Sequence, residues 1–226
     1  NRTDNGSYSD SNQYTIQPIA AATSTSWTVA SDDWAMVVGA FKEIEDPNTA
    51  SMDFELDSSQ YAWTADTADL SILDNFTIEA WVKVETAPAA DAIMNIVAKF
   101  RAAPGTLINH FFAYVDEAGT KKLRFMVARN VPDCNSNEDA YYNVTLTAGT
   151  WYHVAVTRAG ATVLFYVNGT EYNPTTNAIA AGNICDNNID TMIGARGRPN
   201  GPLGLFDGLI DDARIWSDIR TATEIS

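Results

Sequence analysis

The chain has 226 residues, of which 46% are hydrophobic and 19% are charged, so it can bury a core and is not a wholly disordered protein. Its 14 basic and 29 acidic residues give a net charge of −15, which argues against nucleic acid or an anionic membrane surface as a partner. No apolar run approaches the roughly 18 residues of a membrane span, so no membrane insertion is expected. The first residue is Asn rather than Met, which indicates a processed protein or a piece of a longer one.

The first 50 residues differ in character from the rest of the chain. Residues 1–26 are rich in Ser, Thr, Asn and Gln, which is typical of a polar leader, whereas residues 27–41 hold strand-like apolar runs. The polar, proline-containing run 45–50 marks a boundary between segment 1–50 and domain 51–226. We expect 27–41 to form β-structure that pairs either with the following domain or with a neighbouring subunit, and we favour the neighbouring subunit.

From residue 51 onward, short strand-like runs recur between turn signals. In 75–84, Phe76, Ile78, Ala80 and Val82 fall on one face, because side chains alternate along a strand. The pair Asn168-Gly169 is typical of a two-residue hairpin turn. The pattern predicts an all-β fold, an antiparallel β-sandwich. The expected strands are 51–56, 60–64, 75–84, 93–100, 109–115, 121–128, 140–147, 151–157, 161–168 and 203–216.

Five stretches, taken in order, resemble the laminin G-like, concanavalin A-like jelly-roll family. The resemblance implies a jelly-roll sandwich over 51–226, with an extra N-terminal strand segment before it. It also implies that Trp81 and Trp151 fill the space between the sheets and that Gly208 lets the last strand pass close to a neighbour. The fold hosts lectins, glycosidases, adhesion modules and structural domains, so it does not decide the function. The five stretches are 51–61, 76–83, 150–157, 163–169 and 206–216.

The sequence offers no complete catalytic motif. Some β-glucanases of this fold carry Glu-x-Asp-x-x-Glu on one strand, and the nearest run here, 55–60, ends in Gln60, which cannot act as an acid. His110 and His153 each lie within a strand-like run, where a packed histidine is more common than a base. There is no nucleophile elbow and no phosphate-binding loop. We therefore expect a non-catalytic protein.

The resemblance also implies a structural calcium ion, held by an aspartate on the last strand and by groups at the start of the domain. Asp211 or Asp212 would supply the first and the stretch from Asp53 to Asp57 the second, because calcium takes six to eight oxygen ligands. The alternative is a pair of solvated carboxylates, one of them bonded to Arg214.

The two cysteines, Cys134 and Cys185, lie in similar polar loops, and we expect a disulfide between them. It would close a loop of about 50 residues and would place the protein outside the cytoplasm; the alternative is two unpaired thiols. Asn168 starts one of five Asn-x-Ser/Thr triplets, but its turn already explains it. The other four are glycosylation candidates: Asn1, Asn5, Asn75 and Asn143.

The resemblance implies an extracellular, non-catalytic recognition domain that binds carbohydrate or a glycosylated surface. The alternative function is a structural subunit of an extracellular filament, appendage or virion, assembled through residues 27–41. Binding is expected in polar and aromatic rim loops, although the same residues are also compatible with ordinary solvated loops. The candidate ligand-binding residues are Asp133, Asn135, Asn137, Asp139, Tyr141, Tyr142, Asp186 and Asn187.

Overall fold

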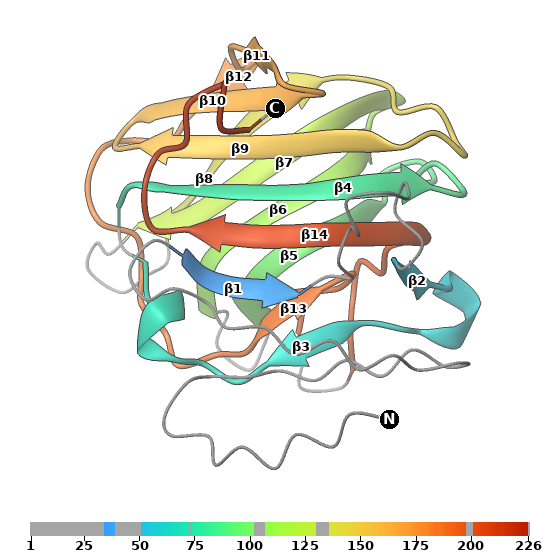
Figure 1. Ribbon diagram of the computed structural model, residues 1–226, viewed down its shortest axis with the longest axis horizontal. Coiled ribbons are helices and arrows are strands. Elements are labelled where there is room, and N and C mark those ends of the chain that lie inside the picture. Colours follow the sequence, from blue (N-terminus) through green and yellow to red (C-terminus); the bar gives the residue numbers. More distant parts are fainter. Residues whose placement is uncertain are drawn as a thin grey trace, which may run out of the picture. The chain divides into compact units, whose positions relative to one another are not determined.

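The computed structural model describes residues 34–38, 51–72, 74–101, 107–129, 136–197 and 201–225, with the backbone alone at 34–38, 107 and 136. Within these ranges the chain forms two seven-stranded antiparallel sheets that face each other as a sandwich (Figure 1). The all-β antiparallel sandwich expected from the sequence is confirmed. We call the sheets A and B, and the outer face of each is the one turned away from the other sheet.

Sheet A has the strand order β1-β14-β4-β9-β10-β11, and β2 also pairs with β14. Its strands are β1 (Trp34–Val38), β2 (Met52–Phe54), β4 (Phe76–Val84), β9 (Tyr152–Ala159), β10 (Thr162–Val167), β11 (Thr170–Tyr172) and β14 (Gly208–Trp216). Sheet B has the order β12-β8-β7-β6-β5-β13-β3. Its strands are β3 (Ala62–Thr64), β5 (Ile93–Arg101), β6 (Leu107–Glu117), β7 (Thr120–Arg129), β8 (Ser136–Asn143), β12 (Thr176–Asn177) and β13 (Thr191–Ile193). Two short 3-10 turns, η1 (Leu56–Ser58) and η2 (Ala68–Leu70), complete the described elements.

The core between the sheets follows from the alternation of side chains. All four apolar residues of the predicted face of β4 are completely buried. Sheet B contributes large aromatic side chains to the same cluster, among them Phe112 and Phe125. Alternation therefore fixes which side chains of each strand are left to form an outer face.

Two tight backbone features agree with the sequence. Asn168 and Gly169 have φ angles of 50° and 74°, and they connect β10 to β11 as the two-residue turn that the sequence predicts. Gly208 has a φ of 132°, and a Cβ there would lie 2.2 Å from the carbonyl oxygen of Lys83. The close approach of β14 to β4 therefore requires glycine.

Strand β1 pairs antiparallel with β14 of the same chain, with Val38 opposite Ala213. Strand β2 pairs with the other end of β14, from Gly208 to Ile210. The edge of β14 thus supplies the partner for residues 34–38, and the neighbouring subunit that we favoured is not needed to account for this strand. Residues 27–33 and 39–41 of the expected segment lie outside the described residues.

The expectation that Trp81 fills the space between the sheets is wrong. Trp81 lies between the core residues Ala80 and Val82 in sequence, so alternation turns it to the outer face of sheet A. It is 37% exposed there, and its ring lies 5.2 Å from that of His153. Trp151 is half-buried with Lys83 over its ring. Phenylalanine side chains such as Phe165 fill the interior instead.

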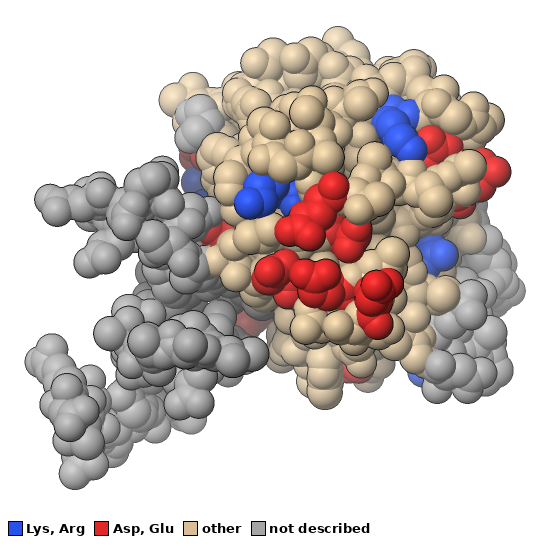
Figure 2. All heavy atoms as spheres, turned by 90° about the vertical axis from the view of Figure 1, so that its right-hand side faces the viewer, with Lys and Arg blue, Asp and Glu red and all other residues tan. Residues whose placement is uncertain are grey.

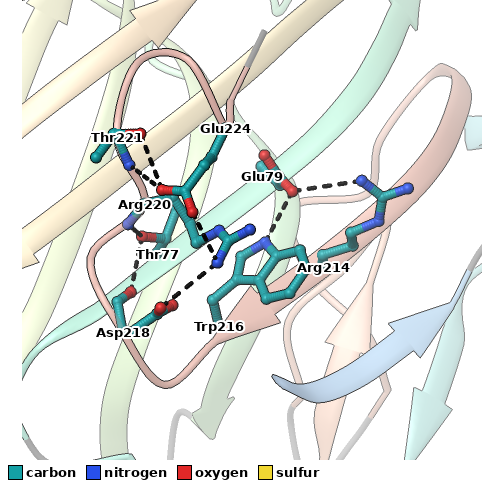
Figure 3. A network of polar contacts seen from close by, with 8 residues as sticks. All are labelled: Thr77, Glu79, Arg214, Trp216, Asp218, Arg220, Thr221 and Glu224. Carbon is teal, nitrogen blue, oxygen red and sulfur yellow. Dashed lines mark hydrogen bonds and ion pairs between the residues drawn. The ribbon is translucent and has the colours of Figure 1, made fainter. Parts of the chain in front are cut away.

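Residues after β14 turn back over the outer face of sheet A (Figure 3). The Thr77 hydroxyl donates to the carbonyl oxygen of Asp218 and accepts from the backbone N–H of Arg220, both at 2.9 Å. Glu224 accepts from the N–H of Thr221 at 2.8 Å, a capping contact that holds the last turn. Ile225 is buried beside Ala155 and Tyr166. The chain end is therefore anchored by both polar and apolar contacts.

Candidate functional site on the outer face of sheet B

The strand register aligns one row of outward-facing residues across six strands of sheet B. Their sequence neighbours Ala62, Ile193, Val97, Phe112, Phe125 and Ala140 belong to or pack against the core, so the row itself lies on the outer face. The row is Trp63, Met192, Ala98, Phe111, Met126 and Asp139, of which the middle four are buried. The next row places Ala113, Arg124 and Tyr141 side by side.

Cationic and aromatic side chains alternate on this face. The Lys122 ammonium lies 5.1 Å from the ring centre of Tyr141, and the Arg124 guanidinium lies 5.3 Å from Tyr141 and 5.2 Å from Phe111. Arg196 lies 5.9 Å from Phe111 and 4.9 Å from Phe100. Each distance is within the range of a cation–π contact. We call the six residues the cation–aromatic ladder: Lys122, Tyr141, Arg124, Phe111, Arg196 and Phe100.

Asp139 orients the central arginine of the ladder. Arg124 Nε donates to Asp139 Oδ1 at 2.8 Å, and Arg124 Nη2 donates to Asp139 Oδ2 at 3.1 Å. Burial lowers the pKa of Arg124, but the hydrogen bonds and charge of Asp139 outweigh it and leave the pKa raised. The two side chains are 18% and 22% exposed, so the ion pair is mostly shielded and part of its surface is open to solvent.

An exposed aromatic residue lies at the other end of the same row from Asp139. Trp63 on β3 is 61% exposed, the most exposed of the large hydrophobic side chains in the described part. It is separated from Asp139 by five strand spacings, or about 24 Å. The outer face thus carries an exposed indole at one edge and an oriented ion pair at the other.

Four of the expected ligand-binding residues, Asn137, Asp139, Tyr141 and Tyr142, lie in strand β8 rather than in a rim loop. Asp139 and Tyr141 face outward beside Arg124, whereas Tyr142 faces inward and stacks on Tyr172, with 4.5 Å between the ring centres. The rim-loop expectation is wrong for these four because a run of polar residues can form a strand when every second side chain faces solvent.

The other expected ligand residues make different contacts or are not described. Asp186 lies 3.7 Å from the buried ammonium of Lys99. Asn187 donates to the carbonyl oxygen of Ile108 at 3.3 Å and to Asn109 at 3.1 Å. These contacts hold the loop against β5 and β6. Asp133 and Asn135 lie outside the described residues.

The expected calcium ligands do not form a cluster of side chains. Asp211 is buried and accepts from the N–H of Asp212 at 2.7 Å, while Asp212 pairs with Arg214 at 2.9 Å. Asp53 and Asp57 are exposed. In the described part of the chain, no three His, Cys, Asp or Glu side chains are placed to hold a metal ion. The donor set therefore does not fit a side-chain metal site, and calcium stays a prediction.

Acidic residues gather where β2, the end of β4 and the start of β14 meet (Figure 2). The charge of Glu85 is the main cause that raises the pKa of Glu55, followed by Asp53, burial, Asp207 and Asp57. Within the run 55–60, Leu56–Ser58 form the 3-10 turn η1, and Gln60 accepts from the N–H of Glu55 at 2.9 Å. This geometry does not place three carboxylates along one strand.

Both histidines are packed, as the sequence indicated. Burial, with a smaller effect of Lys99, lowers the pKa of His110 to about 3, and its ring lies 5.4 Å from that of Phe76. Burial, followed by the charge of Arg214, lowers the pKa of His153 to about 4. Both imidazoles are therefore neutral at pH 7.

Only some of the residues of the expected disulfide and of the glycosylation candidates are described in the structure. Cys185 is fully buried, next to the ladder's apolar residues, and Cys134 lies outside the described residues, so the bridge between them stays a prediction. Asn75 and Asn143 are exposed, whereas Asn1 and Asn5 are not described.

A family model described as the concanavalin A-like lectin/glucanases superfamily matches residues 56–226. The chain belongs to this superfamily. A search among curated proteins found no match. In the described residues, no helix is long and apolar enough to cross a membrane.

Solved structures with the superfamily fold resemble the chain at low sequence identity. The CBM40 module of the Ruminococcus gnavus IT-sialidase, bound to α2,3-sialyllactose, is 12% identical, with a TM-score of 0.54 over 77% of this chain and 94% of that one. A putative carbohydrate-binding protein from Bacteroides ovatus is 22% identical, with a TM-score of 0.50 over 77% and 45%. The receptor-binding domain of botulinum neurotoxin mosaic serotype C/D is 10% identical, with a TM-score of 0.60 over 93% and 48%. At these identities the likeness concerns the fold.

The sequence analysis did not identify most residues of the cation–aromatic ladder. Alternation in β7 does place Lys122 and Arg124 on the face opposite the core residues Leu123 and Phe125. That signal was available and indicates a cationic outer face. The rings that stack on these cations come from other strands, so their identity depends on the register between strands. Arg196 approaches from beyond β13, and no local pattern indicated its contact with Phe111.

Proposed function

We propose that the outer face of sheet B binds carbohydrate and that the domain acts as a non-catalytic recognition module outside the cytoplasm. The half-buried ring of Tyr141 and the exposed indole of Trp63 carry this proposal, because they share the face with a guanidinium that Asp139 holds in one orientation. Small-ligand sites typically combine such apolar surface with a few fixed polar groups. Two of the similar solved structures are carbohydrate-binding by description, which supports the proposal through the shared fold.

The charges on this face favour binding over cleavage. Glycoside hydrolysis normally requires one carboxyl group with a raised pKa and a second carboxylate beside the bond that breaks. Next to the ladder, Asp139 pairs with Arg124, and Glu117 pairs with Lys122 at 2.5 Å. Both carboxylates are thus engaged in ion pairs with neighbouring cations. The location outside the cytoplasm rests on the expected disulfide.

A glycan panel tests the proposed function. The intact protein is expected to retain a subset of immobilised oligosaccharides, and Tyr141→Ala and Trp63→Ala are expected to weaken that binding about tenfold or more. Trp81→Ala is the matched control, because it removes an exposed indole from the opposite sheet. Folded protein that retains no glycan, or an equal loss in the Trp81 variant, would contradict the proposal.

A further inference from the structure

The ladder gathers cations on a chain whose net charge is strongly negative. Its three cations are Lys122, Arg124 and Arg196, and the carboxylates of Glu117 and Asp139 pair with the first two. The chain as a whole carries −15. An acidic ligand is therefore repelled by surfaces such as the acidic end seen in Figure 2, whereas the ladder offers it cations.

Arg124 keeps hydrogen-bonding capacity after it binds Asp139. A guanidinium has five N–H donors, and Asp139 takes one from Nε and one from Nη2. No other described residue accepts a hydrogen bond from Arg124. The remaining donors lie at the end of the guanidinium, on Nη1 and Nη2. Because the guanidinium carbon contacts the rings of Tyr141 and Phe111 and Asp139 holds its Nε side, this edge is held in a fixed direction.

We infer that the ligand of this face is an acidic glycan, a sugar whose carboxylate accepts two hydrogen bonds from the free end of Arg124. The inference rests on the proposed function and names its ligand class. A planar carboxylate matches the two parallel donors of a guanidinium, whereas a single hydroxyl uses one of them. Asp139 already shows the same recognition on the neighbouring edge, so Arg124 would hold one carboxylate from the protein and one from the ligand.

The test compares ligands that differ in the carboxylate alone. Binding of an oligogalacturonate is measured by calorimetry at low salt against the methyl ester of the same oligomer. A sialylated oligosaccharide and the methyl ester of the same oligosaccharide form a second pair, which distinguishes the two common sources of a sugar carboxylate. In at least one pair the free acid is expected to bind about tenfold or more tightly than its neutral partner, because hydrogen bonds to a charged group are strong.

Variants then assign the effect to one side chain. Arg124→Gln removes the charge, and Arg124→Lys keeps the charge but loses the paired donors, so both are expected to reduce binding of the acid about tenfold. Binding of the neutral partner is expected to change little. Lys83→Gln, which removes a cation from sheet A, is the control and is expected to bind like the original protein.

The outcomes separate this inference from the proposed function. Equal affinity for acid and neutral partner in both pairs, in folded protein that binds glycans, would overturn the acidic-glycan inference and leave carbohydrate binding standing. Absence of any glycan binding would overturn both. The ligand comparison uses the original protein, so the inference remains testable even if the Arg124 variants fail to fold.

Discussion

Acid is expected to lower the free energy of unfolding through His110, a buried side chain. The sequence analysis expected this histidine to be a packed residue within a strand. The residue is 1% exposed, and neither ring nitrogen has a hydrogen-bond partner among the described residues. Its pKa is about 3 in the folded protein against 6.5 for an unperturbed histidine. Burial is the main cause and Lys99 the second. Because the folded pKa is the lower one, the stability is complete above pH 6.5 and is lost as the pH falls toward 3.

The size of the effect follows from the same pKa values. At about pH 5 the imidazole of the unfolded chain is mostly protonated while that of the folded protein is not. The difference of about 1.5 pH units from the unfolded pKa corresponds to about 2 kcal/mol of unfolding free energy lost relative to pH 8. Other groups titrate in this range as well, so the quantity to measure is the difference between the original protein and His110→Leu.

Denaturant unfolding at about pH 8 and pH 5 provides the assay. His110→Leu is expected to lose about 2 kcal/mol less than the original protein between the two pH values. Val127→Ala is the control, because Val127 lies opposite His110 on β7 and is fully buried but does not titrate. It should destabilise the protein equally at both pH values. If His110→Leu shows the same pH dependence as the original protein, the depressed pKa assigned to His110 is wrong.

Three further predictions concern the calcium, the cysteines and the N-terminal strand. If Asp211 or Asp212 helps to hold calcium, thorough chelation should lower the melting temperature, and an unchanged curve would exclude the ion. Mass analysis without reduction should link Cys134 to Cys185; two alkylatable thiols in native protein would disprove the bridge and remove the support for a location outside the cytoplasm. Deleting residues 1–44 removes β1 from the edge of β14. The shortened protein should unfold at lower denaturant concentration and associate more readily, and unchanged behaviour would show that β1 contributes little.

Local patterns were sufficient for the strands of the sandwich. The alternation in β4 and the Asn168-Gly169 turn each depend on residues adjacent in sequence, so both could be predicted and both are confirmed. The face of Trp81 was available from the same alternation, but the family resemblance suggested an interior role that the structure contradicts.

The candidate site depends on contacts that sequence alone does not contain. Tyr141 stacks on Arg124 because β7 and β8 pair in one register, and a shift of one residue would turn Tyr142 outward instead. Arg196 contacts Phe111 although the two residues are far apart in sequence. The sequence therefore predicted a site in rim loops, whereas the candidate site in the structure lies on the outer face of sheet B.

The lengths of the outermost strands limit how copies of this domain can join. Strands β3, β11 and β12 have three, three and two residues, so a strand added beside any of them would gain few backbone hydrogen bonds. Strand β14 has nine residues, and β1 and β2 already occupy both ends of its outward edge. Release of β1 would open part of this edge to a strand from another copy, so the pairing of β1 with β14 protects the edge against strand exchange.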